Sequence, residues 1–435
     1  MMPKKIAFKT LGCRLNLYET DALASTFSRR GYEIVDPGEQ PDVFVVNTCT
    51  VTNQGDQKSR QEINRMLKKE ERPVVVVTGC MIDNYKKDLS RLAEADYLVD
   101  NKHKTSLFEI VDAHFKGETI DPGQLKPDVF SFEPARKTFH TRSLIKIQDG
   151  CDNFCTYCIV PKVRGRAVSR PVKDILENIR QVIDYGYKEI VLTGVNIGRY
   201  EFEGTDFESL IEKILEIPGD FRARISSIEP EGFGEKLFDL FAHPKLMPHL
   251  HLCLQSGSDK ILMKMRRFYN ISTFRKTVES IRKRYVHFNL TTDIIVGFPG
   301  ETDEDFQQSV RLAEELNFSH IHTFKYSVRT GTRAARMEDQ VPEKIKNERS
   351  KVIREISLRN KTAFMQSLIG KPQQILVEKI NVKGMARGYG ELYVPLEVDA
   401  KGLKTNEFYP VIPATLKDGN NPVLKAEAIG TRDDQ

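Results

Sequence analysis

The chain has 435 residues, of which 40% are hydrophobic, and this content is enough to bury the cores of two to four domains. It has no amino-terminal stretch of signal-peptide character and no run of the ~18 to 20 apolar residues that a membrane span needs. From these features we expect a cytoplasmic protein with no membrane partner. The net charge of +5 permits an anionic partner without requiring one.

Residues 1–116 alternate between strand-like and helical patterns, and we assign them to one domain. Segments 19–30 and 57–70 have helical periodicity. Four apolar runs predict strands: 5–11, 42–48, 74–79 and 96–99. The alternation predicts an α/β fold with a doubly wound parallel sheet.

Three cysteines of this domain each follow a predicted strand: Cys13, Cys49 and Cys80. Because the carboxyl ends of parallel strands share one edge of a sheet, we expect the three thiols to converge there. Gly12 and Gly79 precede two of them and would let the backbone approach a bulky group closely. The alternative is three small buried side chains, since free cysteine is commonly buried. Three matching positions favour a metal cluster held by three thiolates.

Residues 117–140 lack periodicity and are predicted to be a linker to a second domain, residues 141–366. Helical patterns in that domain cover 171–185, 303–316 and 342–365. Six strands are predicted in it: 143–148, 189–193, 222–228, 249–254, 289–296 and 320–326. Six strand and helix units predict a partial TIM-like (β/α)6 barrel, whose reacting groups lie on the loops that follow the strands.

The loop after the first barrel strand carries Cys151, Cys155 and Cys158 in a Cys-x3-Cys-x2-Cys run. Three thiolates on a four-iron cluster leave one iron open, whereas structural zinc sites are normally closed by four ligands. The alternatives are a thioredoxin-like redox pair and a zinc site completed by a distant residue such as His140. Tyr157 and the glycine- and hydroxyl-rich strand ends favour a cluster with a bound adenosyl cofactor. The seventh cysteine, Cys253, is interpreted as a packing residue.

Residues 367–435 form a third predicted domain of short alternating runs separated by glycine and proline. Its predicted strands are 373–380, 388–395 and 408–413. This pattern predicts a small β-barrel of the oligonucleotide-binding type. Residues 368–435 contain nine basic and nine acidic residues, so net charge gives no support for RNA binding by this domain.

The cysteine run with an aromatic residue before its last cysteine resembles the radical S-adenosylmethionine signature, and the amino-terminal domain is similar to that of the methylthiotransferases. The motif at 11–16 with 18–20, together with 47–53 and 56–61, resembles the MtaB branch, which modifies threonylcarbamoyladenosine in tRNA. The carboxyl-terminal domain resembles the TRAM domain of this family. Further matching stretches follow in order along the chain: 159–161, 163–166, 192–196, 226–230, 254–258, 293–301, 326–329 and 331–332.

The resemblance implies a transferase that inserts a methylthio group at C2 of N6-threonylcarbamoyladenosine, at position 37 next to the anticodon. It implies S-adenosylmethionine as radical source and methyl donor, and two [4Fe-4S] clusters held by Cys151, Cys155 and Cys158 and by Cys13, Cys49 and Cys80. An electron donor such as flavodoxin or ferredoxin, a sulfur source and a monomeric enzyme are also implied. The alternatives are methylthiolation of isopentenyladenosine-37 or of a ribosomal-protein aspartate, and a non-catalytic metal-containing RNA-binding protein.

Position and residue type within these motifs predict the contacts to S-adenosylmethionine. Backbone groups of Gly194 and Val195 are expected at the methionine amino end, where glycine permits close approach. Aromatic and turn residues are expected at the adenine ring, and polar side chains at the ribose or amino group. The remaining predicted contacts are Tyr157, Ser226, Glu229, Gln255, Val296, Gly297 and Phe298.

A basic segment at 258–284 is the predicted site of RNA contact. It holds nine Lys or Arg residues against two acidic ones, and neutralisation of phosphates supplies most non-specific affinity for RNA. The alternative is a solvated helix face. Cations beside aromatic rings stack on unpaired bases, and we predict contacts with the anticodon stem-loop of tRNA by Arg266, Arg267, Phe268, Tyr269 and Arg329.

Overall fold

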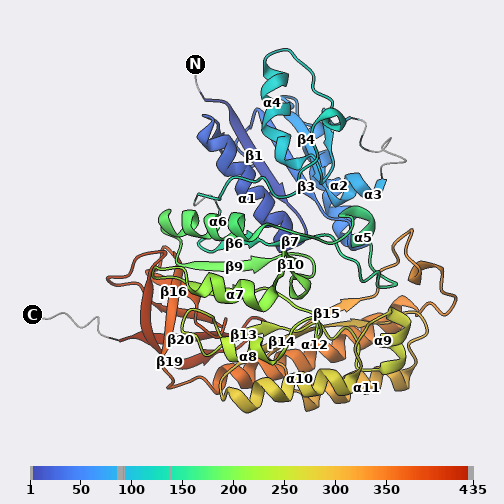
Figure 1. The fold of residues 1–435 in the computed structure, drawn as a ribbon, viewed down its shortest axis with the longest axis vertical. Coiled ribbons are helices and arrows are strands. Elements are labelled where there is room, and N and C mark those ends of the chain that lie inside the picture. The colour runs from blue at the N-terminus through green and yellow to red at the C-terminus, as the bar shows by residue number, and fades with distance from the viewer. Residues whose placement is uncertain (1–2, 86–91, 93, 137–138, 430–435) are drawn as a thin grey trace, which may run out of the picture.

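The computed structural model describes residues 3–85, 92, 94–136 and 139–429, and it divides into three parts (Figure 1). Residues 137–138 of the predicted linker and 430–435 of the predicted third domain lie outside the described residues, as do 1–2, 86–91 and 93 of the first domain. Within the described ranges, we find no helix whose length and apolar character would let it cross a membrane.

The amino-terminal part is a five-stranded parallel sheet in the order β2-β1-β3-β4-β5, which confirms the doubly wound prediction. Its strands are β1 (Lys5–Thr10), β2 (Glu33–Ile34), β3 (Val43–Thr48), β4 (Val74–Gly79) and β5 (Tyr97–Val99). Its helices are α1 (Arg14–Arg29), α2 (Asn53–Leu67), α3 (Cys80–Tyr85) and α4 (Leu107–Phe115). Helices α1 and α4 cover one face and α2 and α3 the other, so β3 and β4 are continuous apolar runs.

The segment after α4 returns along the amino-terminal domain. It includes the short 3-10 helix η3 (Pro122–Gln124), and η2 (Lys104–Ser106) precedes α4. Phe132 is buried and meets Tyr18 of α1 edge-on, with ring centroids 5.7 Å apart. Phe132 of the predicted linker is therefore packed against α1.

The central part is an open barrel of six parallel strands in two sheets, ordered β12-β9-β6 and β13-β14-β15. Isolated parallel bridges at Ala223 with Leu246 and at Ile228 with Leu252 join the two sheets, which confirms the predicted six-stranded partial barrel. The strands are β6 (Ser143–Lys146), β9 (Glu189–Thr193), β12 (Arg222–Ile225), β13 (His249–His251), β14 (Asn289–Val296) and β15 (His320–Lys325).

Helices surround the barrel and bury its apolar outer face. They are α6 (Val172–Asp184), α7 (Phe207–Leu215), α8 (Glu235–Leu240), α9 (Asp259–Met265), α10 (Ile271–Arg284) and α11 (Asp303–Glu315). Because side chains alternate along a strand, the opposite face of the same strands is free to carry polar residues such as Glu189, Arg224 and His251. Shorter elements are β7 (Gln148–Asp149), α5 (Val160–Val163), β8 (Val168–Ser169), η4 (Ile197–Arg199), β10 (Glu201–Phe202), β11 (Thr205–Asp206) and η5 (Ala334–Arg336).

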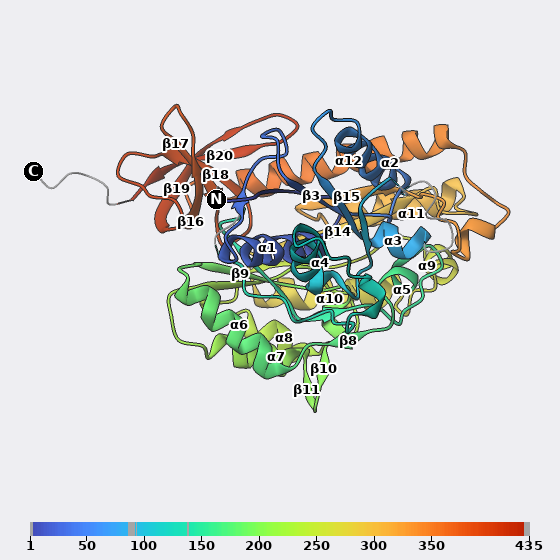
Figure 2. The same ribbon diagram turned by 90° about the horizontal axis from the view of Figure 1, so that it is seen from above.

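Helix α12 (Glu343–Gln366) leads to a closed barrel in the order β16-β17-β18-β20-β19, as predicted for the third domain, and this barrel lies at one end of the helix (Figure 2). One predicted strand is wrong, because a turn held by hydrogen bonds between Gly390 and Tyr393 and between Gly390 and Val394 divides 388–395. The strands are β16 (Gln373–Ile380), β17 (Met385–Tyr389), β18 (Pro395–Asp399), β19 (Phe408–Lys417) and β20 (Val423–Ala428).

The closed barrel docks on the amino-terminal ends of the central strands. Arg222 and Arg224 of β12 donate to four of its carbonyl oxygens, at Gln374, Tyr389, Gly390 and Glu391, over 2.7 to 3.0 Å. Both arginines also pair with the buried carboxylate of Glu189. The carboxyl ends of the central strands, where the cysteine loop lies, are left for the amino-terminal domain.

Candidate active site

The cysteine loop follows β7 and is held by backbone hydrogen bonds. The Cys151 N–H donates to the Gly165 carbonyl at 3.1 Å, and the Cys158 N–H donates to the Cys155 carbonyl at 3.0 Å. Thr156 is tied to the end of α9 through the carbonyls of Lys264 and Met265. All three cysteine residues are partly exposed.

The second cysteine set lies at the carboxyl ends of three adjacent strands, as expected. Cys13 follows β1 and precedes α1, Cys49 follows β3, and Cys80 opens α3 directly after β4. A Cβ added at Gly12 would lie 2.9 Å from the Cys49 sulfur, so Gly12 does approach this set closely. Gly79 has a different role, because its added Cβ would meet the Thr48 carbonyl oxygen of the adjacent strand at 2.5 Å.

The two cysteine sets are neighbours across the domain boundary. Cys80 packs against Ile159 and Val163, which directly follow the cysteine loop. Asn101 bridges the same boundary, since its amide nitrogen donates to the Val163 carbonyl at 3.0 Å and lies 3.8 Å from the Cys80 sulfur. The amino-terminal sheet edge therefore faces the cysteine loop.

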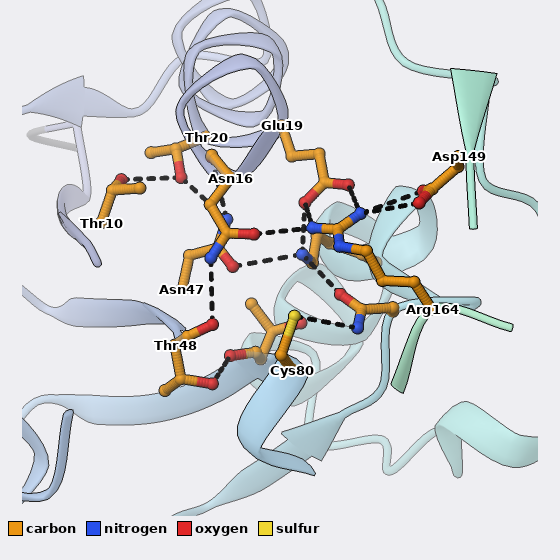
Figure 3. A network of polar contacts seen from close by, with 12 residues as sticks. Thr10, Asn16, Glu19, Thr20, Asn47, Thr48, Cys80, Asp149 and Arg164 are labelled. Atoms are coloured by element: carbon orange, nitrogen blue, oxygen red, sulfur yellow. Dashed lines mark hydrogen bonds and ion pairs between the residues drawn. The ribbon is translucent and has the colours of Figure 1, made fainter. Parts of the chain in front are cut away.

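A buried network of charges joins the two sets (Figure 3). Glu19 of α1 binds Lys104 at 2.5 Å, Lys146 of β6 at 3.0 Å and Arg164 at 2.9 Å. Arg164 also pairs with Asp149, which stands two residues before Cys151, and donates to Asn16 at 2.7 Å. Asn16 and Glu19 lie in the first two turns of the helix that begins after Cys13, so the network fixes one cysteine set relative to the other.

Electrostatics at the second set depend on this network. Burial raises the pKa of Cys49 to about 11, and it raises the pKa of Cys80 while Arg164 opposes that rise. In the cysteine loop, burial and then Cys155 raise the pKa of Cys158 to about 12. Ligation requires thiolates, so a cationic metal group is needed to deprotonate these thiols at neutral pH.

The donor sets fit an iron-sulfur cluster better than a single ion. Among the described His, Cys, Asp and Glu residues, neither cysteine set brings its three sulfur atoms within 4.8 Å of one another, as ligands of one ion would be. His140, the candidate fourth zinc ligand, lies 3.9 Å from Asp21 instead. Three all-thiolate donors around a wider centre are the ligand type of a four-iron cluster.

Arg329, which follows β15 of the central barrel, also binds the amino-terminal domain. Its side chain is 5% exposed and donates to Asn53, Thr50 and Asp56 over 2.6 to 2.7 Å. These partners surround the start of α2, just after Cys49. We had predicted an RNA contact for Arg329, but a buried guanidinium with these partners positions the domain instead.

The predicted contacts at the methionine end lie on the loop after β9. A Cβ added at Gly194 would meet Ile197 at 2.6 Å and the Gln148 carbonyl at 2.8 Å, so only glycine fits. The N–H groups of Val195 and Asn196 donate to the Gln148 side chain at 3.0 and 2.9 Å. Gln148 was not predicted, and it fixes this loop by occupying the amide of Val195.

The residues predicted to contact the adenine ring pack against one another in a wall, with Tyr157 in front of the buried Phe298. Tyr157 is partly buried and meets Phe298 edge-on, with centroids 6.4 Å apart, while Phe298 and Val296 are fully buried. Gly297 has φ +70° and its added Cβ would lie 2.3 Å from Lys346. Tyr157 is thus the ring of this wall that a ligand can reach, with Phe298 as its support.

The polar candidates differ in their surroundings. Ser226 is buried, and Gln255 is buried with φ +68° beside the bridge to Ile294. Glu229 pairs with Arg267, whose side chain is only 3% exposed and lies 3.1 Å from the Cys155 sulfur. Glu229 therefore reaches the cysteine loop through Arg267.

The structure corrects two of the predicted RNA contacts. Arg267 is buried against Cys155, and Tyr269 is 6% exposed with its hydroxyl donating to the Cys253 and Leu254 carbonyls. Neither ring nor guanidinium can stack on a base from that position. Arg266 and Phe268 remain on the surface, with Phe268 55% exposed beneath the Arg199 guanidinium.

The basic segment is also partly neutralised by neighbouring helices. Arg275 of α10 binds Glu315 of α11 in a bidentate pair at 2.6 and 2.7 Å. Arg284 pairs with Glu235 and Asp239 of α8. The positive run in the sequence therefore stabilises the outer helical layer.

Sequence analysis missed a polar cluster inside the barrel. His251 and Cys253 follow one another on the inner face, and the His251 Nε2 lies 3.2 Å from the Asp293 carboxylate. Among the described His, Cys, Asp and Glu residues, this trio is the one whose ligand atoms all lie within 4.8 Å. Cys253 had been interpreted as packing; the alternation of His249, His251 and Cys253 was the signal that a polar inner face existed.

Two family models match the chain. The model described as Radical SAM superfamily matches residues 145–313, and the one described as Uncharacterized protein family UPF0004 matches residues 5–100. The first match contains the cysteine loop and the second contains Cys13, Cys49 and Cys80.

Curated relatives match over most of the chain. The threonylcarbamoyladenosine tRNA methylthiotransferase MtaB of Thermotoga maritima is 36% identical over 422 residues, covering 95% of each protein. The tRNA-2-methylthio-N6-dimethylallyladenosine synthase of Burkholderia thailandensis is 33% identical and covers 87% of this chain and 86% of its own. A solved structure of the radical S-adenosylmethionine methyltransferase TsrM from Kitasatospora setae shares the fold, with TM-score 0.56, 16% identity and coverage of 77% of this chain and 74% of its own.

Proposed function

This chain belongs to the MtaB branch of the radical S-adenosylmethionine methylthiotransferases, and from that membership we propose that it inserts a methylthio group at C2 of N6-threonylcarbamoyladenosine, next to the anticodon at position 37 of tRNA. The observation that carries the proposal is the packing of Cys80 against Ile159 and Val163, which makes the two cysteine sets neighbours. A radical source and a sulfur source must both reach one substrate carbon.

The residues of the two sets fit two [4Fe-4S] clusters. Cys151, Cys155 and Cys158 would hold one, and Cys13, Cys49 and Cys80 the other. When bound, these clusters and S-adenosylmethionine supply the radical chemistry, the sulfur and the methyl group that no side chain provides. An electron donor such as flavodoxin or ferredoxin and a sulfur source complete the requirements of the reaction.

The chain's own residues orient and enclose these groups. Arg267 donates toward the Cys155 sulfur at 3.1 Å, and Asn101 lies 3.8 Å from that of Cys80. Gly194 lets the loop after β9 pack closely against Gln148 and Ile197, where any side chain would clash, and the partly buried Tyr157 ring offers an apolar face for the adenine. The buried network of Glu19, Arg164 and Asp149 keeps both sets in one orientation.

Two exposed phenylalanines near the cysteine loop support contact with unpaired RNA bases. Phe154 is 38% exposed under Arg166, and Phe268 is 55% exposed under Arg199. Each ring with its guanidinium forms a stacking platform of the kind that binds single-stranded nucleic acid. We place the anticodon loop here, with Arg266 beside Phe268, and expect the enzyme to act as a monomer in the cytoplasm.

Mass spectrometry of tRNA nucleosides from a strain lacking this gene tests the proposal. Methylthiolated threonylcarbamoyladenosine should disappear and return when the gene is restored. The relative at 33% identity supports one alternative substrate, the dimethylallyl-type adenosine. Loss of that product instead, with the threonylcarbamoyl product unchanged, would overturn the proposed substrate.

A further inference from the structure

A cavity of about 280 Å³ lies inside the central barrel, between the amino-terminal ends of β13, β14 and β15 and the docked carboxyl-terminal barrel. Its lining contains no aspartate or glutamate. The basic and imidazole residues that line it are Arg14, His249, His251, His320, His322 and Lys361. This composition is that of an anion-binding site.

The strand register brings the imidazoles together. His251 of β13 lies opposite Thr291 of β14, which in turn lies opposite His320 of β15. Asp293 of β14 lies opposite His322 of β15. The His320 and His322 rings lie 4.5 Å apart, and those of His251 and His322 5.3 Å apart. Burial, followed by His322, lowers the pKa of His320 to about 4, so this group stays neutral at pH 7 and acts through hydrogen bonds.

The Arg14 and Lys361 side chains of the cavity lack counter-ions among the described residues. Neither the Arg14 nor the Lys361 side chain has a hydrogen bond or ion pair with any described residue, although both residues are partly buried. Arg164, Arg329 and Arg349, by contrast, are each bound to a carboxylate. A partly buried cation without a partner is costly, and an anionic ligand removes that cost.

A third polar group points to a ligand at the same place. His249 is 3% exposed, and its Nδ1 has no hydrogen-bond partner among the described residues. Burial, then Arg224 and then Arg14 lower the pKa of His249, so its imidazole is neutral. The Asp293 carboxylate is engaged by His251 at 3.2 Å, while His251 Nδ1 lies 2.9 Å from the Thr291 hydroxyl.

We propose that this cavity binds the carboxylate of the substrate's N6 side chain, with Arg14 and Lys361 as the charged donors. The proposal rests on the proposed function, because the threonylcarbamoyl group carries a carboxylate and a dimethylallyl group does not. Arg14, which lines the cavity, directly follows Cys13 of the second cysteine set in the sequence. A substrate whose N6 group is uncharged would leave Arg14 and Lys361 unpaired. The cavity therefore selects between the substrates of the two groups of relatives.

Exchange of the carboxylate tests the proposal. Synthetic anticodon stem-loops carrying either threonylcarbamoyladenosine or its carboxamide are titrated into the reconstituted holoenzyme under anaerobic conditions. The wild-type enzyme should bind the carboxylate form ~10- to 100-fold more tightly, as expected for a hydrogen bond to a charged group. In R14Q and K361M this preference should shrink toward equality.

Two surface substitutions serve as controls for R14Q and K361M. Arg65 lies on the surface of α2 and Lys351 on the exposed face of α12, so R65Q and K351M should keep the wild-type preference. If R14Q weakens the binding of both stem-loops equally, the cavity recognises phosphate or shape and the proposal is overturned. Unchanged binding of both stem-loops would also overturn it. If the wild-type enzyme fails to methylthiolate the carboxylate stem-loop at all, the proposed function fails, whatever the cavity binds.

Discussion

Arg164 donates to both carboxylate oxygens of Glu19, at 2.9 and 3.2 Å, and so joins the barrel to the amino-terminal domain through two buried side chains. Three cations, Lys104, Lys146 and Arg164, share two carboxylates, those of Glu19 and Asp149. The excess of one positive charge lies near Cys80, where Arg164 and Lys104 oppose the rise in pKa that burial causes. The network therefore both positions the second cysteine set and favours its ligating form.

Removing the charge of Glu19 should destabilise the protein strongly. E19Q keeps the shape but leaves three buried cations with one carboxylate, which should cost about 3 to 5 kcal/mol in the free energy of unfolding. Urea denaturation measures this cost. E62Q is the control, because Glu62 pairs with Lys9 and Arg65 at the surface and should cost less than about 1 kcal/mol. Equal effects of the two variants would contradict a buried network.

Stability should fall with acid through Glu189. Burial raises its pKa, but Arg224, Arg222 and Arg142 outweigh burial and lower it from 4.5 to about 2. Because the pKa is lower in the folded state, the stabilisation is present above pH 4.5 and is lost as the pH falls toward 2. It amounts to about 3 kcal/mol, since each pH unit between the two values is worth ~1.4 kcal/mol.

The measurement is the free energy of unfolding between pH 6 and pH 3 for wild type and E189Q. Burial lowers the pKa of Arg224 to about 10, so its positive charge is constant over this range. E189Q should be less stable at neutral pH and should show a shallower decline in acid. A parallel decline of the two proteins would assign the acid sensitivity to other carboxylates.

Gly12→Ala should damage the second cysteine set alone. Gly12 has φ +103°, and an added Cβ would lie 2.7 Å from the Cys49 Cβ and 2.9 Å from its sulfur. Iron bound by the reconstituted variant should drop by about half, from about eight to about four irons. Gly31 has φ +88° with nothing within 4 Å, so G31A carries comparable backbone strain and should keep its iron.

Arg329→Met should loosen the amino-terminal domain. Asp56 is 2% exposed and would lose its cationic partner, at a cost of about 3 to 5 kcal/mol. Because the contacts of Arg329 with the start of α2 lie beside Cys49, the variant should cleave more S-adenosylmethionine for each methylthio group transferred. R311M, which breaks an exposed pair with Glu304, is the control. An unchanged ratio of cleavage to transfer in R329M would contradict the role of Arg329 in positioning the amino-terminal domain.

Strand ends and cysteine spacing predicted the architecture because both depend on local patterns. The positions of Cys13, Cys49 and Cys80 after apolar runs sufficed to place them on one sheet edge. The buried network was not predicted, since Glu19, Lys104 and Asp149 lie in separate segments and only the packing of α1 against β6 brings them together.

Charge runs were the weakest predictor. The basic segment at 258–284 contains only two acidic residues, but Glu315 and Glu235 approach Arg275 and Arg284 in the fold. Arg267 and Tyr269 turn inward because the chain after α9 reverses at Arg266, with φ +60°. Such a reversal is set by tertiary contacts and leaves no signal in composition.

The central claim, that one cysteine set makes the radical and the other delivers sulfur, is tested most directly by the triple variant C13S, C49S and C80S. After anaerobic reconstitution it should bind about four irons, cleave S-adenosylmethionine to 5′-deoxyadenosine, and transfer no methylthio group to threonylcarbamoyladenosine-containing RNA. Methylthio transfer by this variant, or loss of cofactor cleavage together with transfer, would contradict the division of roles.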